Sequence, residues 1–129
     1  MKKFLLGSML FLVGLTSYGQ TQAEMNNDAS SHYQQTENEI NKVYKQVMIK
    51  YSDDTLFIKK LKIAQRLWIK LRDAELELKF PDRSYSGSLY TMCYMNYKTD
   101  LTQARIDKLK KWIKGTTEGD ACPGSIKTR

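Results

Sequence analysis

Apolar side chains recur every three or four residues along three long segments, and this spacing constrains the fold more than any other feature of the chain. The segments span residues 29–51, 55–80 and 88–115. A period near 3.6 residues is that of an α-helix with one buried stripe. No segment alternates with the two-residue period of a strand. The sequence therefore predicts an all-α fold in which three long helices pack as an antiparallel bundle around a single core.

The residues between these segments supply the expected helix ends. Residues 52–54, Ser-Asp-Asp, provide a break and a cap for the second helix. Pro81 ends that helix and opens the turn-rich stretch PDRSYSGS, whose last residue, Ser88, is expected to cap the third helix. Gly115 is a suitable C-terminal stop. Residues 115–129 have no period, so we expect an irregular tail.

The first 19 residues have the layout of a secretory signal peptide. Two lysines precede an apolar run over residues 4–16, and small residues follow it. That run is too short to span a membrane. Cleavage is expected after Gly19, with Ala23 as the alternative, which leaves a helical domain over residues 20–129. No cysteine directly follows the apolar run, so a lipid anchor is not expected. The predicted product is a soluble periplasmic or secreted protein without a membrane span.

Loss of Lys2 and Lys3 with the leader lowers the formal net charge from +7 to +5. Such a charge favours anionic partners, including lipid headgroups, acidic glycans and nucleic acid. Most of the lysines, however, fall on helix faces that contact water whatever the function. Export also argues against a nucleic-acid partner. The charge therefore leaves an anionic surface as one open possibility and does not identify a partner.

Both cysteines, Cys93 and Cys122, belong to the exported part, where an oxidising compartment permits a disulfide. A helix from Cys93 to Ile113 would be about 30 Å long. The nine extended residues that follow reach about 31 Å. A Cys93–Cys122 disulfide is therefore predicted only if the tail folds straight back along the third helix or that helix ends early.

The second helix places charged side chains on its apolar side. At about 100° per residue, Gln65, Arg72 and Glu75 all fall within about 40° of Leu61 around the helix axis. On the third helix, Arg105 falls inside the apolar arc. The predicted buried arc of the second helix consists of Phe57, Ile58, Leu61, Ala64, Trp68, Leu71 and Leu76.

An isolated buried charge costs several kcal/mol, so these groups need partners. Arg72 and Glu75 are three residues apart and can pair along the helix. The ring of Trp68, one turn before Arg72, can face the guanidinium. Glu37 and Asn41, at the edge of the first helix's stripe, could complete the hydrogen bonds. The preferred interpretation is a polar network that sets the register of the helices, and the alternative is a ligand-binding pocket.

These residues also carry a family resemblance. Gln65, Trp68, Arg72, Asp73 and Ala74 stand in the pattern Q-x-x-W-x-x-x-R-D-A, which resembles the LprI-like lysozyme-inhibitor family of small exported bacterial proteins. Further matches are Met25, Asn26, Asn41, Tyr44, Gly87, Ser88, Thr102, Arg105 and Leu109. The resemblance implies an all-helical domain and, for some members, binding and inhibition of lysozyme. We expect Gln65, Trp68, Arg72, Asp73, Ala74, Glu75, Thr102 and Arg105 to serve the fold.

The chain departs from the family at its cysteines. Many members have cysteines where this chain has Leu76 and Tyr97, and another where it has Asp28. Because Leu76 and Tyr97 replace both of the first two cysteines, we expect that a family disulfide is lost here and that these side chains fill its space. Cys93 and Cys122 lie outside those positions, so their bond would be a different one.

No residue pattern indicates catalysis. The only histidine, His32, has no nucleophile or metal ligand beside it, and neither cysteine has a second ligand at metal spacing. Asp53 and Asp54 suit a helix cap, whereas Asp73 and Glu77 suit a face in water. We therefore expect neither an enzyme, nor a metal site, nor a cofactor.

The loop after Pro81 is the candidate partner-binding site. Asp82, Ser84 and Tyr85 are expected at its tip, followed by Gly87. Short polar side chains at one end of a rigid bundle could enter the cleft of a lysozyme. Three nearby tyrosines, at positions 90, 94 and 97, are expected to belong to the core, although aromatic side chains there could also anchor a partner.

A competing hypothesis is a non-inhibitory envelope protein. It would bind another protein or an anionic surface through the lysine-rich helix faces. The sequence identifies neither the partner nor the oligomeric state.

Overall fold

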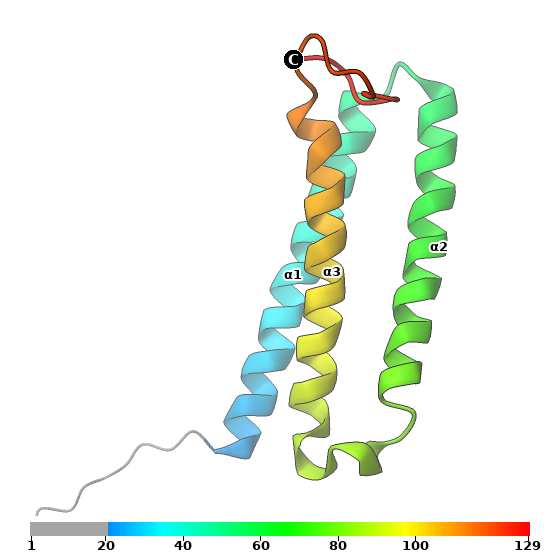
Figure 1. Ribbon diagram of the computed structural model, residues 1–129. Helices are drawn as coiled ribbons and strands as arrows, with labels where there is room; N and C mark the ends of the chain where they lie inside the picture. The colour runs from blue at the N-terminus through cyan, green and yellow to red at the C-terminus, as the bar shows by residue number, and fades with distance from the viewer. Residues whose placement is uncertain (1–20) are drawn as a thin grey trace, which may run out of the picture.

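The computed structural model describes residues 21–129, and the predicted leader lies outside them. Three long helices follow one another, each antiparallel to the preceding one (Figure 1). The prediction of an all-α fold with three long helices is confirmed. No helix among the described residues has the length and apolarity needed to cross a bilayer. The elements are α1 (Gln22–Lys50), α2 (Thr55–Lys79), the short 3₁₀ helices η1 (Arg83–Tyr85) and η2 (Gly87–Leu89), and α3 (Tyr90–Lys114).

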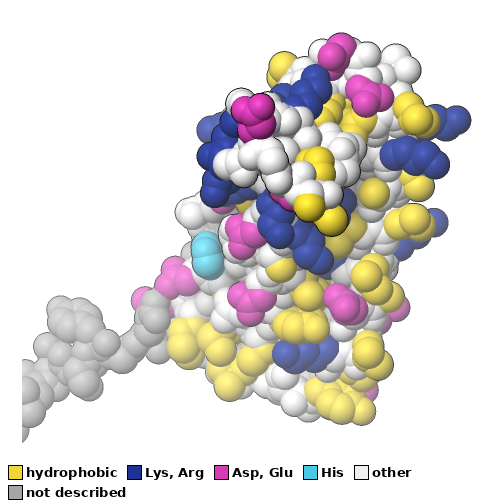
Figure 2. All heavy atoms as spheres, turned by 45° about the horizontal axis from the view of Figure 1, so that its top comes forward, with side chains coloured by type: hydrophobic (Ala, Val, Ile, Leu, Met, Phe, Trp, Pro, Cys, Tyr) yellow, Lys and Arg dark blue, Asp and Glu magenta, His cyan; other side chains and the backbone are white. Residues whose placement is uncertain are grey.

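α2 stands further from the other helices than these do from each other. α1 and α3 lie side by side along their length, whereas α2 contacts mainly α3, and more sparsely (Figure 1). Hydrophobic and basic side chains mix on the side of the molecule that α2 forms (Figure 2). The sparse contact of α2 with the other helices explains one wrong prediction of the helical wheel. Ala64 and Leu71, both predicted to be buried, are exposed, because α2 contacts its neighbours along a stripe narrower than the predicted arc.

Small buried threonines lie on the helices of the α1–α3 pair. Thr36 of α1 and Thr99 and Thr102 of α3 are buried. Each hydroxyl donates a hydrogen bond to the carbonyl four residues earlier, at 2.7–3.1 Å. The polar group is therefore satisfied within its own helix and needs no partner across the contact. Short side chains also let two helix axes approach closely.

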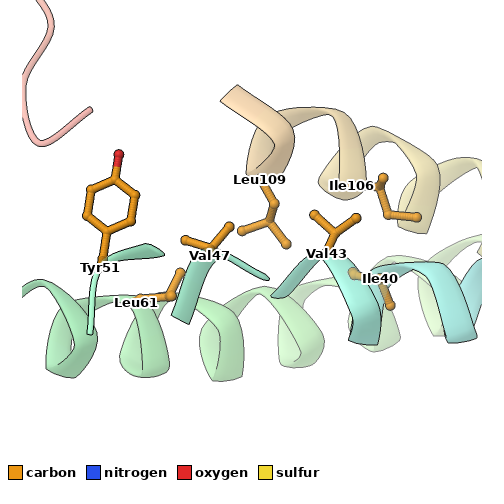
Figure 3. Close-up of a cluster of buried hydrophobic side chains, with 7 residues drawn as sticks. All are labelled: Ile40, Val43, Val47, Tyr51, Leu61, Ile106 and Leu109. Atoms are coloured by element: carbon orange, nitrogen blue, oxygen red, sulfur yellow. The ribbon is translucent and has the colours of Figure 1, made fainter. Parts of the chain in front are cut away.

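A cluster of buried apolar side chains joins the three helices (Figure 3). Val47, Ile106 and Leu109 are completely excluded from solvent. Only one residue of this cluster, Leu61, comes from α2, which agrees with the looser position of that helix. The core consists of Ile40, Val43, Val47 and Tyr51 of α1, Leu61 of α2, and Ile106 and Leu109 of α3.

The start of α1 depends on a capping motif that the spacing of apolar residues does not reveal. α1 begins at Gln22, seven residues before the pattern does, because Thr21 and Glu24 form a capping box. The Thr21 hydroxyl accepts from the Glu24 amide at 3.2 Å, and the Glu24 carboxylate accepts from the Thr21 amide at 2.7 Å. Asp54 caps α2, as predicted, by accepting from the Phe57 amide at 2.8 Å.

The expected cap of α3 is wrong. Ser88 lies inside η2, and the cap position, Leu89, makes no side-chain hydrogen bond. Because η2 runs directly into α3, its backbone already leads into the first turn of the helix.

The tail crosses the end of the bundle and joins α1 to α3 (Figure 1). The Tyr51 hydroxyl donates to the Trp112 carbonyl at 3.1 Å and accepts from the Lys127 amide at 2.9 Å. The Lys127 ammonium binds the Lys50 carbonyl and the Asp53 carboxylate at 3.0 and 2.7 Å. The tail is irregular, as expected, but it is fastened to both helices.

Gly115 ends α3 and starts the tail at a φ of +76°. A Cβ atom there would lie 2.7 Å from the Lys127 carbonyl oxygen, so both the turn and the returning tail require glycine.

The predicted disulfide does not form. Cys93 is in the first turn of α3, whereas Cys122 is in the tail beyond the other end of that helix, and both thiols are free. α3 reaches Lys114, and the tail turns toward α1 rather than back along α3. Neither condition for the bond is therefore met.

We predict that the folded, non-reduced protein contains two titratable thiols. Cys122 is exposed and should react with a thiol reagent faster than the half-buried Cys93. A thiol titration before and after denaturation, combined with peptide mapping, measures both rates. Absence of free thiols in the monomer would contradict the structure.

A second prediction compares two leucines of α2 that are two residues apart. Leu76 is 1% exposed and Leu78 is 83% exposed. Leu76→Ala should lower the free energy of unfolding by about 2–5 kcal/mol, because it removes buried apolar volume. Leu78→Ala, the matched control, should change it by less than about 0.5 kcal/mol. Urea denaturation measures both, and equal effects would show that α2 is oriented differently.

Candidate functional site

Polar and aromatic side chains meet along the inner side of α2, where it faces the other two helices. We call this group the polar seam. It comprises Tyr33 and Glu37 of α1, Gln65, Trp68, Arg72 and Asp73 of α2, and Lys98 and Arg105 of α3.

Arg72 points inward, as the wheel predicted, and is only 9% exposed. Its Nε and Nη2 donate to Oδ1 of Asp73 at 2.9 and 2.8 Å. The expected partner, Glu75, is not used, because the guanidinium bends back to the neighbouring carboxylate. The guanidinium carbon lies 5.2 Å from the centre of the Trp68 ring, so the predicted stacking is confirmed. The buried charge is thus neutralised within α2.

Arg105 makes the corresponding contact from α3. Its Nε donates to Oε1 of Gln65 at 3.0 Å, and its guanidinium carbon lies 5.9 Å from the centre of the Trp68 ring. Burial lowers the pKa of Arg105, although a guanidinium stays charged at neutral pH. Trp68 therefore has one guanidinium from its own helix and one from α3 within about 6 Å, which joins α2 to α3.

α1 closes the seam through an aromatic side chain. The Tyr33 hydroxyl donates to Oε1 of Glu37 at 3.1 Å, and the Lys98 ammonium lies 4.4 Å from the centre of the Tyr33 ring. Burial, opposed by the charge of Arg72, raises the pKa of Tyr33 to about 12. Burial and repulsion from Arg72 lower the pKa of Lys98. Glu37 thus binds within its own helix, and Asn41 is exposed and stays outside the seam.

The seam groups bind one another, which supports the network interpretation over the pocket. An apolar hollow of about 200 Å³ does lie beside the seam, between α2 and α3. Arg105 and Lys60 are its charged neighbours. Its lining is completed by Phe57, Leu61, Ala64, Leu109, Trp112 and Ser125.

The loop after α2 has a defined geometry. Oδ1 of Asp82 accepts hydrogen bonds from the hydroxyl and, at 2.7 Å, from the amide of Ser84, and these bonds lower the pKa of Asp82. The guanidinium of Arg83 lies 5.6 Å from the centre of the Tyr90 ring. Tyr85 is 69% exposed. Gly87 adopts a φ of +53°, which favours glycine at this turn.

An aromatic cluster supports this loop. Phe80 is buried, and its ring centre lies 5.9–6.0 Å from those of Tyr90, Tyr94 and Tyr97. Lys79 covers the Tyr97 ring at 3.8 Å. The three tyrosines are half-buried, whereas Tyr85 extends away from them. The loop therefore presents one aromatic side chain above a packed base.

A protein-family model described as lysozyme inhibitor LprI matches residues 15–109. The match includes the whole polar seam, the loop and α3 up to Leu109. The chain belongs to the LprI family. This is a family of lysozyme inhibitors and not of enzymes. No curated protein and no solved structure gives a significant match.

The LprI motif residues divide between the seam and its surroundings. Gln65, Trp68, Arg72, Asp73 and Arg105 belong to the seam, and Thr102 is completely buried on α3. Ala74 is exposed and Glu75 half-buried, and neither has a contact that defines the seam.

Sequence reasoning did not assign Tyr33 to the polar network, and it missed the seam residue Lys98 altogether. Its signal was available, because Lys98 precedes Arg105 by seven residues, or two helical turns, and thus shares its face of α3.

We predict that Arg72→Met lowers the free energy of unfolding by about 1–3 kcal/mol, since it removes a charged hydrogen bond and the stacking on Trp68. Met keeps much of the side-chain volume, and Asp73 is exposed enough to remain solvated. The matched control is Arg66→Met, an exposed arginine of the same helix, with an expected change below about 0.5 kcal/mol. Urea denaturation measures both variants. If Arg72→Met is as stable as the unchanged protein, the seam does not hold α2.

Proposed function

We propose that this LprI-family protein binds a lysozyme and inhibits it through the loop over residues 81–87. The observation that carries the proposal is Tyr85, an aromatic side chain held 69% exposed on an ordered turn at one end of the bundle. Family membership supports the class of partner. No comparable large aromatic side chain is exposed elsewhere among the described residues.

The loop is suited to binding because its shape is set in advance. Asp82 closes the turn, Arg83 lies over Tyr90, and Phe80 anchors the base of the loop in the aromatic cluster. A segment already ordered in the free protein loses less conformational entropy on binding. Exposed tyrosine and arginine are also the residue types that contribute most to protein interfaces.

The chemistry of a lysozyme cleft suits the side chains of the loop. The cleft holds a sugar chain and acts with two carboxyl groups. In the proposed complex, Tyr85 occupies space that a sugar ring would take, and Arg83 lies near the carboxylates. Asp82 and Arg83 carry opposite charges, so the loop adds little to the net charge of +5. A basic enzyme would therefore meet less repulsion at the loop than at the lysine-rich faces.

Export after cleavage at Gly19 is part of the proposal. Cleavage there leaves Thr21 in place to cap α1, whereas cleavage after Ala23 would remove the capping residue and the start of the helix. The periplasm or the cell exterior is where a lysozyme would be met.

We predict that Tyr85→Ala and Asp82→Ala each weaken inhibition by more than about tenfold without unfolding the domain, because both residues are exposed. Clearing of a bacterial suspension by chicken-type lysozyme measures inhibition, and circular dichroism checks the fold. Ile49→Ala, a large exposed side chain of α1, is the control.

Asp82→Asn distinguishes two roles that Asp82 could have, which are shaping the loop and contacting the lysozyme through its charge. An amide oxygen can still accept the Ser84 hydrogen bonds, so retained inhibition would assign Asp82 to shaping the loop. Inhibition by Tyr85→Ala equal to that of the unchanged protein would sink the proposed contact.

The second candidate is a non-inhibitory envelope protein that binds another protein or an anionic surface. One observation favours it: the first two thirds of α2 expose five cations, Lys59, Lys60, Lys62, Arg66 and Lys70. Exposed charges are screened over about 10 Å at 0.1 M salt. Binding to anionic vesicles or to envelope proteins that disappears at moderate salt, without lysozyme inhibition, would support this alternative.

A further inference from the structure

α2 carries a second apolar stripe on the side away from the polar seam. Leu56, Leu67 and Leu71 are 64%, 60% and 58% exposed, Ile63 is 44% exposed and Leu78 is 83% exposed. Single exposed aliphatic side chains are ordinary on a protein surface. These five, however, share one face of one helix with Ala74 and Lys60. We call Leu56, Lys60, Ile63, Leu67, Leu71, Ala74 and Leu78 the outer stripe.

The spacing of the outer stripe is that of a helix-pairing seam. Its successive intervals are four, three, four, four, three and four residues. Alternation of threes and fours is the pattern by which one helix packs lengthwise against another. No other described element covers the apolar members of this stripe, since α3 contacts the opposite side of α2. Lys60, at the edge of the stripe, also borders the hollow between α2 and α3.

The spacing is also symmetric about Leu67. If a second α2 is laid antiparallel with Leu67 opposite Leu67, then Leu56 faces Leu78, Ile63 faces Leu71 and Lys60 faces Ala74. Every stripe position thus meets a stripe position. This is the condition for a twofold interface, in which the same patch on both copies is self-complementary.

The charges beside the stripe select the antiparallel direction. Lys59, Lys60 and Lys62 lie near the start of α2. Three carboxylates, Asp73, Glu75 and Glu77, outnumber the single Lys79 near its end. Antiparallel copies bring the basic end of each helix beside the acidic end of the other. Parallel copies would place lysines beside lysines. Arg66 and Lys70 lie near the axis, where their long side chains can extend into water.

We propose that the outer stripe binds a second copy of this chain, with the two α2 helices antiparallel about an axis at Leu67. The second half of α2 argues against an anionic bilayer as the occupant, because Asp73, Glu75 and Glu77 offset its basic residues and only the first half of the stripe would be attracted. One helix face buries less than the about 1,600 Å² of a standard interface. The dimer is therefore weak and its population depends on concentration.

The proposed dimer does not depend on the inhibition of lysozyme. Each loop over residues 81–87 follows the end of its own α2, so the antiparallel dimer carries its two loops at opposite ends. Neither loop therefore lies beside the other loop.

The first test measures mass against concentration. The full chain is expressed with its own leader, and the exported product is analysed by sedimentation from about 1 to 500 μM, the range of a weak complex. The mass should rise toward that of a dimer. Leu67→Asp places two carboxylates at the axis and should raise the dissociation constant by more than about tenfold. Ile49→Asp, a change at a similarly exposed position of α1, should not.

The second test checks the register by cysteine crosslinking with Cys93→Ser and Cys122→Ser in place. Leu67→Cys should form a disulfide with itself, because its partner lies directly opposite. Leu56→Cys alone should not, since the two copies of position 56 are about 33 Å apart along the antiparallel pair. A mixture of Leu56→Cys and Leu78→Cys should crosslink.

Three results would overturn the proposal. One is a monomer throughout the concentration range. Another is self-crosslinking of Leu56→Cys, which indicates parallel helices. The third is a monomer that binds vesicles through the outer stripe, lost in Leu67→Asp, which would assign the stripe to a membrane surface. Circular dichroism of each variant separates loss of pairing from loss of fold.

Discussion

α1 and α3 pack along their length, and this contact determines what α2 can do. Threonines are buried on both helices of the pair, and each satisfies its hydroxyl within its own helix. The two helices thus share most of the apolar core, and α2 contributes only Leu61 to the packed cluster. A helix placed outside such a pair needs another means of attachment, and it keeps a long side in water.

The polar seam supplies that attachment. Trp68 lies near the guanidiniums of Arg72 and Arg105, and Gln65 bonds the second of these. Such contacts are directional, so they specify the register of α2 in a way that apolar packing alone does not. Closer to the loop, the attachment of α2 is apolar and aromatic, because Leu76 is buried and Phe80 contacts Tyr97.

The helices and the inward arginines could be predicted because both depend on local periodicity. The pattern over residues 55–80, and the Asp54 cap, were enough to place α2 and to turn Arg72 inward. The partner of Arg72 could not be predicted, because a flexible guanidinium can reach carboxylates at several positions.

The prediction that Leu71 is buried was wrong for a different reason. α2 is apolar on two sides, and periodicity does not say which side the rest of the chain covers. The tail has no period, so its contact with Tyr51, and with it the separation of the cysteines, depends on three-dimensional packing alone.

The seam and the loop are coupled through the covalent path between them. Phe80 follows α2 directly and sits among the tyrosines beneath the loop, so a shift of α2 along its axis would move both the aromatic base and Tyr85. The position of Tyr85 therefore depends on Trp68 and Arg72, although neither is near the loop in sequence. Loss of inhibition after a change in the seam would then show a displaced loop, and only changes that leave α2 in register can identify a direct contact.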